Sequence, residues 1–260
     1  MNCVKMKLVK GMAVGFLAGW LLAGCSSGYS LVGVEGGRIA ITDKYDRNTD
    51  PEASSILKPY QQKVDSIMKP VIGHSARALS AYRPESPLSN WIADVLRQSA
   101  VRAIGKPADV AVMNMGGIRN AMPEGEITYG TIYEIAPFEN ALCVLTMDGA
   151  TLKELFAEIA SVHGEGLSGA ALQIDEEGNL LDAKVNGRPV EEKKVYTVAT
   201  IDYLAEGNDR MMAFRKAQSK TFPKDALLRG LLLDAVKQCE QKGQFVSAQV
   251  EGRIKVSASN

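Results

Sequence analysis

Short apolar runs alternate with amphipathic stretches along most of this chain, and only short turns separate them. The apolar runs are strand-length, whereas the amphipathic stretches repeat apolar residues at helical spacing. Because strands and helices are interspersed, the pattern favours an α/β (α+β) fold, a single layered domain with mixed β-sheets and flanking helices. Strands are expected over 108–113, 140–147, 172–174, 180–185, 195–200 and 253–256, helices over 52–67, 86–104, 131–135, 150–162 and 225–239, and a flexible loop over 163–169.

The first 24 residues have the features of a secretory signal. Lys5, Lys7 and Lys10 precede an uncharged stretch over 11–24. At about 1.5 Å per residue this stretch is short for a hydrocarbon core of roughly 30 Å, which indicates a signal peptide rather than a membrane span. It ends in Leu-Ala-Gly-Cys at residues 22–25, which resembles a bacterial lipobox. We therefore expect a lipoprotein signal peptide over 1–24, cleavage before Cys25 and lipidation of that residue.

Lipidation of Cys25 would anchor the chain to a membrane of the bacterial cell envelope. The next residue is Ser26 rather than an acidic retention signal, so the outer membrane is the expected destination, with either the periplasmic or the surface leaflet open. Residues 25–49 are expected to form a lipidated tether with a hairpin over 29–42, around Gly36-Gly37. Residues 50–260 are expected to form the folded domain, and Pro59 either kinks its first helix or marks the start of that helix.

Charge and histidine content exclude two classes of function. The chain has 30 basic and 30 acidic residues, which speaks against binding a nucleic-acid polymer, because phosphate-backbone affinity depends on clustered Lys and Arg. Only His74 and His163 are present, too few for a two-metal hydrolytic centre that relies on several imidazoles. Cys143 and Cys239 match no metal-binding spacing and are expected to be free thiols, although the compartment would permit a disulfide between them.

A glycine-bearing loop follows the expected strand 108–113. Gly116 and Gly117 would let the backbone approach a ligand closely. Asn114 carries both a donor and an acceptor, and Arg119 offers a planar fork of donors for carboxylate, phosphate or hydroxyl oxygens. From spacing alone, a tight turn with a surface arginine remains the alternative.

Two aromatic residues stand at the ends of other elements. Phe138 follows Pro137, and Tyr203 follows the expected strand 195–200. Two such rings can sandwich a flat heterocycle, at about 1–3 kcal/mol per stacked base. Asp209, just after a glycine and an asparagine, could accept hydrogen bonds from a ribose diol. Core aromatics and an ordinary turn aspartate are the alternatives.

Several separated motifs, in the same order and spacing, resemble the C-terminal, substrate-binding domain of the 5'-nucleotidase/UDP-sugar hydrolase family. The resemblance extends over roughly residues 50–256. The motifs are Val71–Gly73, Glu85–Asp94, Ala108–Val110, Asn114–Arg119, Gly125–Gly130, Pro137–Asn140, Met147–Leu152 and Tyr196–Asp209.

The resemblance implies a nucleotide-binding fold and assigns roles to particular residues. In that family two aromatics clamp the base, and the matching residues here are Phe138 and Tyr203. The asparagine before the glycines touches the base, which matches Asn114. An arginine after the glycines and an aspartate hold the ribose and nearby oxygens, which matches Arg119 and Asp209. A second arginine precedes the helix that begins near residue 87, and Arg83 is the nearest candidate, about one position out of register.

The sequence departs from the family pattern in three places. One glycine of the usual three is replaced by Met115, the usual Gly-Gly-Asp-Gly becomes Gly-Asn-Asp-Arg at 207–210, and Tyr203 replaces a phenylalanine. In the family a separate metallophosphatase domain normally precedes this one and supplies the metal ligands. No such motif occurs here, so we expect no catalytic or metal-ligating residue in this chain.

The combined expectation is the nucleotide- or nucleoside-binding part of a 5'-nucleotidase system, in the form of a stand-alone bacterial lipoprotein. Divalent metals and hydrolysis would come from a separate metallophosphatase, and the chain alone is not expected to hydrolyse phosphate esters. Two alternatives stay open: a lipoprotein that binds nucleosides or nucleotides without catalysis, and a scaffold that only docks partners.

Overall fold

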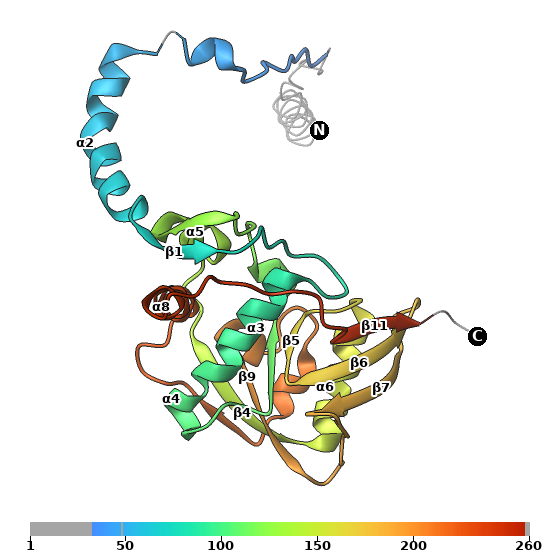
Figure 1. Cartoon of the computed structure of the whole chain (residues 1–260). Coiled ribbons are helices and arrows are strands. Elements are labelled where there is room, and N and C mark those ends of the chain that lie inside the picture. The colour runs from blue at the N-terminus through green and yellow to red at the C-terminus, as the bar shows by residue number, and fades with distance from the viewer. Residues whose placement is uncertain (1–32, 48, 258–260) are drawn as a thin grey trace, which may run out of the picture. The chain divides into compact units, whose positions relative to one another are not determined.

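The computed structural model describes residues 33–47 and 49–257, and in this part of the chain helices flank three β-sheets (Figure 1). The chain divides after Ala53 into two units, and the folded domain lies within the second, residues 54–260. The expected signal peptide and the lipidation residue Cys25 lie outside the described residues.

The described elements alternate between helix and strand along the chain. The helices are α2 (Pro51–Met68), α3 (Pro87–Ser99), α4 (Val101–Ile104), α5 (Tyr129–Ile135), α6 (Gly149–Ser161), α7 (Asp202–Ala205) and α8 (Leu228–Gln241), with 3-10 turns η1 (Asp43–Tyr45), η2 (Met115–Gly117) and η3 (Met212–Lys216). The strands are β1 (Val71–Ser75), β2 (Val110–Met113), β3 (Gly125–Thr128), β4 (Leu142–Asp148), β5 (Gly166–Ser168), β6 (Ala170–Asp175), β7 (Leu180–Val185), β8 (Arg188–Pro189), β9 (Val195–Ile201), β10 (Ser219–Thr221) and β11 (Ile254–Ser257).

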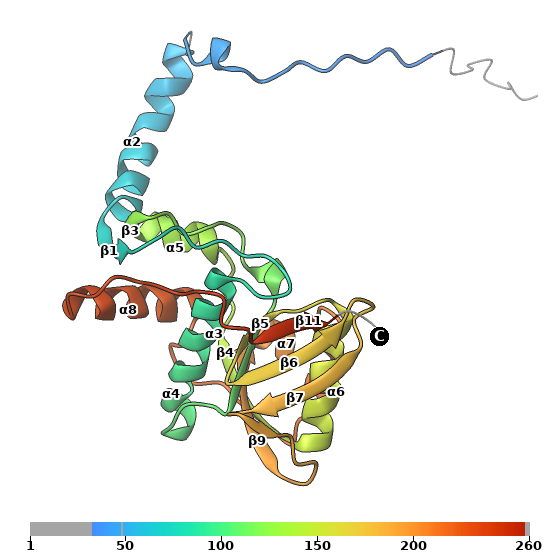
Figure 2. The same cartoon turned by 45° about the vertical axis from the view of Figure 1, so that its right-hand side comes forward.

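A five-stranded sheet forms the centre of the domain, in the order β10-β4-β9-β2-β5. Strands β9 and β2 are parallel, and the other neighbours are antiparallel. All residues of β2 and five of the seven residues in each of β4 and β9 are buried, because α3 packs on β2, β5 and β9 while α6 packs on β4 and β9 (Figure 2). Burial on both faces explains why these strands appear in the sequence as continuous apolar runs rather than alternating ones.

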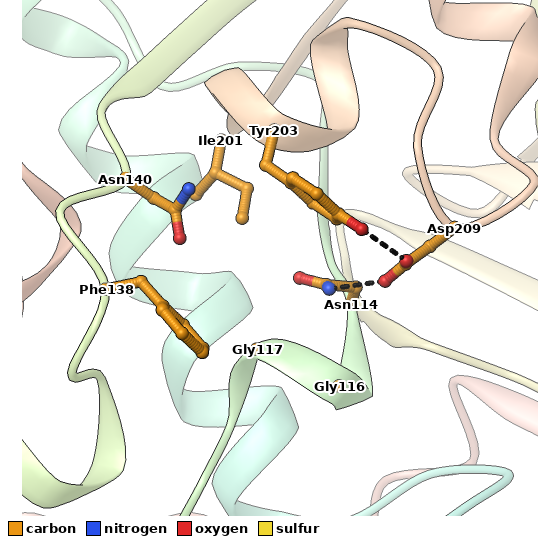
Figure 3. A pocket seen from close by; sticks show the side chains of 8 residues that line it. All are labelled: Asn114, Gly116, Gly117, Phe138, Asn140, Ile201, Tyr203 and Asp209. Carbon is orange, nitrogen blue, oxygen red and sulfur yellow. Dashed lines mark hydrogen bonds between the residues drawn. The ribbon is translucent and has the colours of Figure 1, made fainter. Parts of the chain in front are cut away.

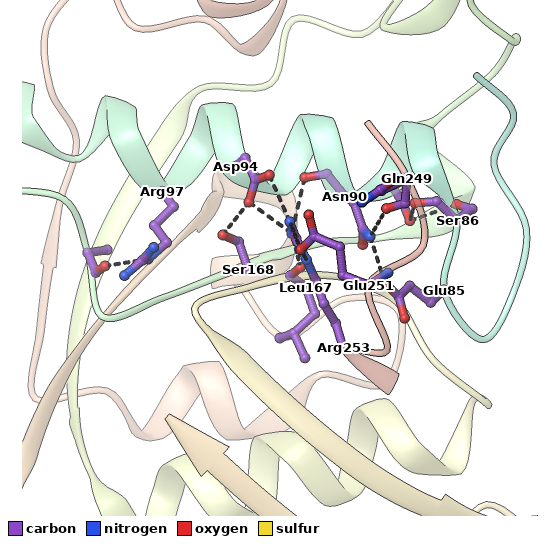
Figure 4. Close-up of polar contacts among 12 residues, drawn as sticks. Glu85, Ser86, Asn90, Asp94, Arg97, Leu167, Ser168, Gln249, Glu251 and Arg253 are labelled. Carbon is purple, nitrogen blue, oxygen red and sulfur yellow. Dashed lines mark hydrogen bonds and ion pairs between the residues drawn. The ribbon is translucent and has the colours of Figure 1, made fainter. Parts of the chain in front are cut away.

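A second sheet, in the order β11-β6-β7-β8, packs against α6. The residue before β11, Arg253, is joined to α3 by a partly buried polar cluster, in which it binds both carboxylate oxygens of Asp94 at 2.8 Å (Figure 4). Buried Glu85 accepts hydrogen bonds from the Asn90 side chain and from the backbone of Glu251, both at 2.7 Å. These contacts make the C-terminal strand part of the domain.

The mixed α/β architecture confirms the expected fold class, with local corrections. The expected hairpin over 29–42 is wrong over its described part, because residues 33–42 contain no strand and are exposed. An isolated two-stranded ribbon with no face to bury is marginal in water. Pro59 lies inside α2, which begins at Pro51, so it does not mark the start of that helix.

The expected flexible loop over 163–169 is also wrong, because it contains strand β5, whose residues are all buried. Strand β10 was not expected either. Both thiols, Cys143 and Cys239, are free. Among the described residues no helix combines the length and the apolar character that crossing a membrane requires.

Candidate functional site

Three chain segments converge at one end of the central sheet because of its register. In the antiparallel pair β4 and β9, Leu142 lies opposite Ile201, so the residues before β4 and those after β9 meet. Strand β2 runs parallel to β9, with Ala111 beside Ala199, so β2 ends at the same edge. The carboxyl ends of parallel strands are a common place for ligands to bind.

At this edge lies a hollow of about 390 Å³, into which the three segments direct their side chains (Figure 3). We refer to it as the hollow throughout. Buried Ile201 supplies an apolar surface, and most of the exposed lining is apolar. The hollow is lined by Asn114, Gly116, Gly117, Phe138, Asn140, Ile201, Tyr203 and Asp209.

Phe138 and Tyr203 face each other across the hollow (Figure 3). Phe138 comes from the loop before β4, and Tyr203 from α7, directly after β9. The two residues are 50% and 42% exposed, so neither ring is covered by the core. The arrangement leaves ring faces free to stack on a flat ligand.

Asn114 and Asp209 form the polar side of the hollow. Asn114 Nδ2 donates to Asp209 Oδ2 at 2.6 Å, and Tyr203 Oη donates to Asp209 Oδ1 at 2.9 Å. Because a carboxylate can only accept, the first bond fixes the orientation of the Asn114 amide. Its other atom, Oδ1, is buried and has no protein partner, and it points toward the space between the two rings (Figure 3). An orphaned buried acceptor favours a ligand that donates a hydrogen bond there.

The phenol of Tyr203 interacts electrostatically with Asp209. The hydrogen bond to the Asp209 carboxylate, together with its negative charge, raises the pKa of the Tyr203 phenol above its ordinary value. The phenol therefore stays a donor over the physiological pH range. Asp209 itself has a φ of +53°, a left-handed conformation that Asp tolerates better than most residues.

The space around the two glycines of the turn η2, Gly116 and Gly117, differs. A Cβ on Gly117 would lie 2.7 Å from Asn114 Oδ1 and 2.6 Å from the end of Met113, so a side chain there would displace the asparagine. A Cβ on Gly116 would make only ordinary contacts, 3.7 Å from Asp209 and 3.8 Å from Asn114. Gly117 is therefore required by packing, whereas Gly116 forms part of the open lining.

Six of the eight residues that the sequence suggested for ligand binding line the hollow, and Arg119 and Arg83 do not. Arg119 is exposed and donates from Nη1 to the carbonyl of Gly116 at 3.2 Å. Arg83 donates to the carbonyl of Gly164 at 2.8 Å and to the carboxylate of Glu165 at 2.5 Å. Arg119 thus contacts the backbone of one lining residue from outside, and Arg83 contacts two residues that do not line the hollow.

Sequence reasoning missed two lining residues, Asn140 and Ile201. Asn140 donates to Asp202 Oδ1 at 3.0 Å and presents its amide to the hollow beside Phe138 (Figure 3). A signal for Asn140 was its position two residues after Phe138, just before a buried strand. Ile201 is the last residue of β9, two positions before Tyr203, which places both side chains at the same end of the sheet.

Within the described residues, no three His, Cys, Asp or Glu side chains gather so that they could hold a metal ion. The groups around the hollow are rings, amides, a phenol and a carboxylate. They are suited to holding a flat, hydrogen-bonding ligand.

The chain is similar in sequence to known proteins. A family profile described as the C-terminal domain of 5'-nucleotidase matches residues 71–216. Endonuclease YhcR of Bacillus subtilis is 33% identical over 175 residues, 64% of this chain and 14% of that protein. Protein UshA of Escherichia coli is 28% identical over 162 residues, 60% of this chain and 29% of that protein.

Solved structures agree with the sequence comparison. The 5'-nucleotidase precursor of Thermus thermophilus superimposes with a TM-score of 0.68 at 27% identity, over 79% of this chain and 43% of that one. The NAD nucleotidase of Haemophilus influenzae shares the fold, with a TM-score of 0.60 at 19% identity, over 84% of this chain and 44% of the other. This chain spans less than a third of the two curated relatives named above. The profile match covers more than half of the chain, which therefore belongs to the family of 5'-nucleotidase C-terminal domains.

Proposed function

We propose that this chain is the nucleotide- or nucleoside-binding part of a 5'-nucleotidase system, and that a separate metallophosphatase carries out the hydrolysis. The observation that carries the proposal is the hollow, with Phe138 and Tyr203 facing each other above the buried, unpartnered Asn114 Oδ1. Membership of the 5'-nucleotidase C-terminal domain family supports a nucleotide-binding role.

The division of labour between binding and chemistry is physically sufficient. Positioning of the substrate and stabilisation of charge by metal ions dominate phosphoryl transfer, and the two can come from different polypeptides. In this arrangement the hollow holds the base and sugar, while the partner supplies divalent metals and an activated water. The chain itself contributes no catalytic residue.

The proposal includes an anchored location. Cys25 would carry a lipid after cleavage of the signal peptide and would hold the domain at the bacterial cell envelope, with the outer membrane as the favoured site. Mass spectrometry of the chain expressed in a bacterial host tests this, because acylation adds a lipid mass that Cys25→Ala abolishes. An unmodified N-terminus in the wild-type protein would contradict the anchor.

Calorimetric titration of the full-length chain with adenosine and with AMP tests binding. Loss of one stacking ring should cost about 1–3 kcal/mol, a fall in affinity of about 5- to 150-fold, for Phe138→Ala and for Tyr203→Ala. Phe222→Ala is the matched control, because Phe222 is also half exposed but does not line the hollow. Unchanged affinity in both ring variants would contradict the stacking site.

Phosphate release tests the division of labour. The full-length chain is mixed with AMP and with the metallophosphatase encoded nearest to it in the source genome. Faster release by the mixture than by either protein alone supports a two-part enzyme. Nucleoside binding without any gain in release would leave a non-catalytic binding lipoprotein, and absence of binding would leave a docking scaffold.

A further inference from the structure

A buried carboxylate lies directly beneath the glycine turn of the hollow. Glu165 is only 3% exposed. Strand β5 pairs antiparallel with β2, with Gly166 opposite Met113. The residue before β5 therefore lies beside the residues that follow β2, which places Glu165 against the turn that carries Asn114 and Met115.

Each carboxylate oxygen of Glu165 has its own donor. Oε2 accepts a hydrogen bond from the backbone N–H of Met115, the first residue of η2. Oε1 accepts from Nη2 of Arg83 at 2.5 Å. The Nε of Arg83 donates to the carbonyl of Gly164 at 2.8 Å, so the guanidinium holds both the carboxylate and the backbone beside it.

The segment that carries Glu165 has little room to move. A Cβ on Gly164 would lie 2.2 Å from the carbonyl oxygen of Pro84, so the two backbones are in direct contact. Gly164 also has a φ of +108°, which favours glycine. Arg83 and Glu165 are thus brought together by two segments that are locked against each other.

Burying a carboxylate is costly unless hydrogen bonds and an opposite charge compensate. Burial raises the pKa of Glu165 above its ordinary value, whereas the Met115 N–H and the Arg83 charge act in the opposite direction. A buried glutamate that does nothing but support the core could be replaced by an apolar residue. Here Glu165 Oε2 accepts the hydrogen bond of the Met115 N–H, the first backbone donor of the turn that presents Asn114.

We propose that Glu165 and Arg83 are positioning residues for the ligand-binding hollow: Arg83 holds the carboxylate, and the carboxylate fixes the turn that carries Asn114, Gly116 and Gly117. The inference rests on the proposed function for the identity of the ligand. It assigns Arg83 to the support of the turn rather than to direct contact with a phosphate.

Titrations with adenosine and AMP on the full-length chain separate these two roles. Arg83→Met and Glu165→Met, which removes both carboxylate acceptors, should each weaken both ligands by at least about tenfold, the effect of losing one charge-assisted hydrogen bond, with the AMP-to-adenosine ratio unchanged. The double variant should bind about as weakly as either single variant, because both changes break the same support. Arg83→Lys should restore part of the affinity, since an ammonium still pairs with Glu165.

Arg102→Met is the matched control. Arg102 has a side chain 42% exposed, against 41% for Arg83, and its ion pair with Asp234 at 2.8 Å lies away from the hollow. We expect its affinity for both ligands to equal that of the wild type. Loss of AMP binding with intact adenosine binding in Arg83→Met would overturn the proposal, because it would show direct contact with the phosphate.

Amide hydrogen exchange without ligand tests whether Glu165 and Arg83 fix the turn, independently of the proposed function. Protection of the Met115 amide should fall in Glu165→Met, which has no acceptor left, and in Arg83→Met, and it should persist in Arg102→Met, with protection of the β2 amides unchanged. If the wild type bound neither ligand, the proposed function would fail while this measurement still decided the positioning role. Unchanged protection of Met115 in both variants would overturn that role.

Discussion

Gly116 and Gly117 are neighbours in the turn of the hollow, yet the space around them differs sharply. A Cβ on Gly117 would force Asn114 Oδ1 and the end of Met113 to move, because it would approach both more closely than 3 Å. Overpacking of this kind typically costs about 1–3 kcal/mol. We expect Gly117→Ala to lower the free energy of unfolding by that amount, measured by urea denaturation, and to weaken nucleoside binding because Asn114 is displaced.

Gly116→Ala provides the comparison within the same turn. Its Cβ meets neighbours only at 3.7 Å or beyond, and its φ is not positive, so the free energy of unfolding should stay within about 0.5 kcal/mol of the wild type. Equal destabilisation by the two substitutions would mean that close packing against Asn114 is not the reason for Gly117.

Single residues show where sequence reasoning stops. Phe138, Tyr203 and Asn114 could be proposed because the motifs around them resemble those of a known family in order and spacing, whereas residue type alone left core aromatics and a tight turn open. Glu165 could not, because a glutamate in a glycine-rich segment looks like solvent-exposed loop. Its burial depends on the pairing of β5 with β2, a contact between residues more than 50 positions apart, and on the Arg83 charge from a third segment.

At the scale of elements, α6 begins with a carboxylate cap. Asp148 accepts a hydrogen bond from the backbone N–H of Thr151 at 2.8 Å, and this bond lowers the pKa of Asp148 below its ordinary value. A lowered pKa in the folded state stabilises the protein above the unfolded-state pKa of about 4, and that stabilisation is lost as the pH falls through the folded-state value. In Asp148→Asn the amide oxygen still caps the helix without titrating.

We therefore expect the free energy of unfolding of Asp148→Asn to fall less than that of the wild type between about pH 6 and about pH 3. Urea denaturation at both pH values measures it, and the difference between variants removes the contribution of all other groups. Gln173→Ala, which removes no titrating group from the exposed part of β6, should retain the wild-type dependence of the free energy of unfolding on pH. If the free energy of unfolding of Asp148→Asn fell between the two pH values as much as that of the wild type, the charge of Asp148 would not contribute to the cap.

The loop that carries Phe138 is held by α8. Arg229 donates from Nη1 to the carbonyls of Ala136 at 3.4 Å and Pro137 at 3.1 Å, and its guanidinium lies 4.7 Å above the ring of Tyr133. Arg229→Met keeps an apolar stem over that ring but removes the Nη1 donor of both hydrogen bonds. We expect about a fivefold to tenfold loss of adenosine affinity by calorimetry, since one net hydrogen bond contributes about 1 kcal/mol.

Asp234→Asn on the same helix is the control, because it breaks only the exposed ion pair with Arg102. Its adenosine affinity should match the wild type. Wild-type affinity in Arg229→Met would instead show that Phe138 is held in place without α8.

The sequence pattern was reliable for elements buried on both faces and weak for the two edges of the central sheet. Strands β5 and β10 are those edges, and each has only three residues. An edge strand pairs on one side only, so it needs no long apolar run, and Ser-Lys-Thr in β10 carries no signal of its own. Tertiary pairing with β2 and β4 decides their structure.

At the scale of the molecule, the domain combines a buried central sheet with one edge that carries the hollow. The convergence of β2, β4 and β9 places rings, amides and a carboxylate around one hollow, while the described residues supply no metal cluster. In the proposed function, this domain binds and orients a substrate while the chemistry takes place on another polypeptide. Its stability must then come from its own core.

The contribution of the N-terminal part to that stability can be measured. Among the described residues before Met68, none is buried, including the apolar side chains on α2 at Ile56, Leu57, Tyr60, Val64 and Ile67. Removal of side chains that bury no surface leaves the hydrophobic term almost unchanged. We therefore expect a chain that begins at Met68 to melt within about 2 °C of the chain that begins at Ser26, as measured by circular dichroism.

A clearly lower melting temperature of the shorter chain would mean that the apolar stripe of α2 is covered in solution. The substitution pair Leu57→Ser and Val64→Ser would then reproduce the loss in the longer chain, whereas Gln62→Ser would not.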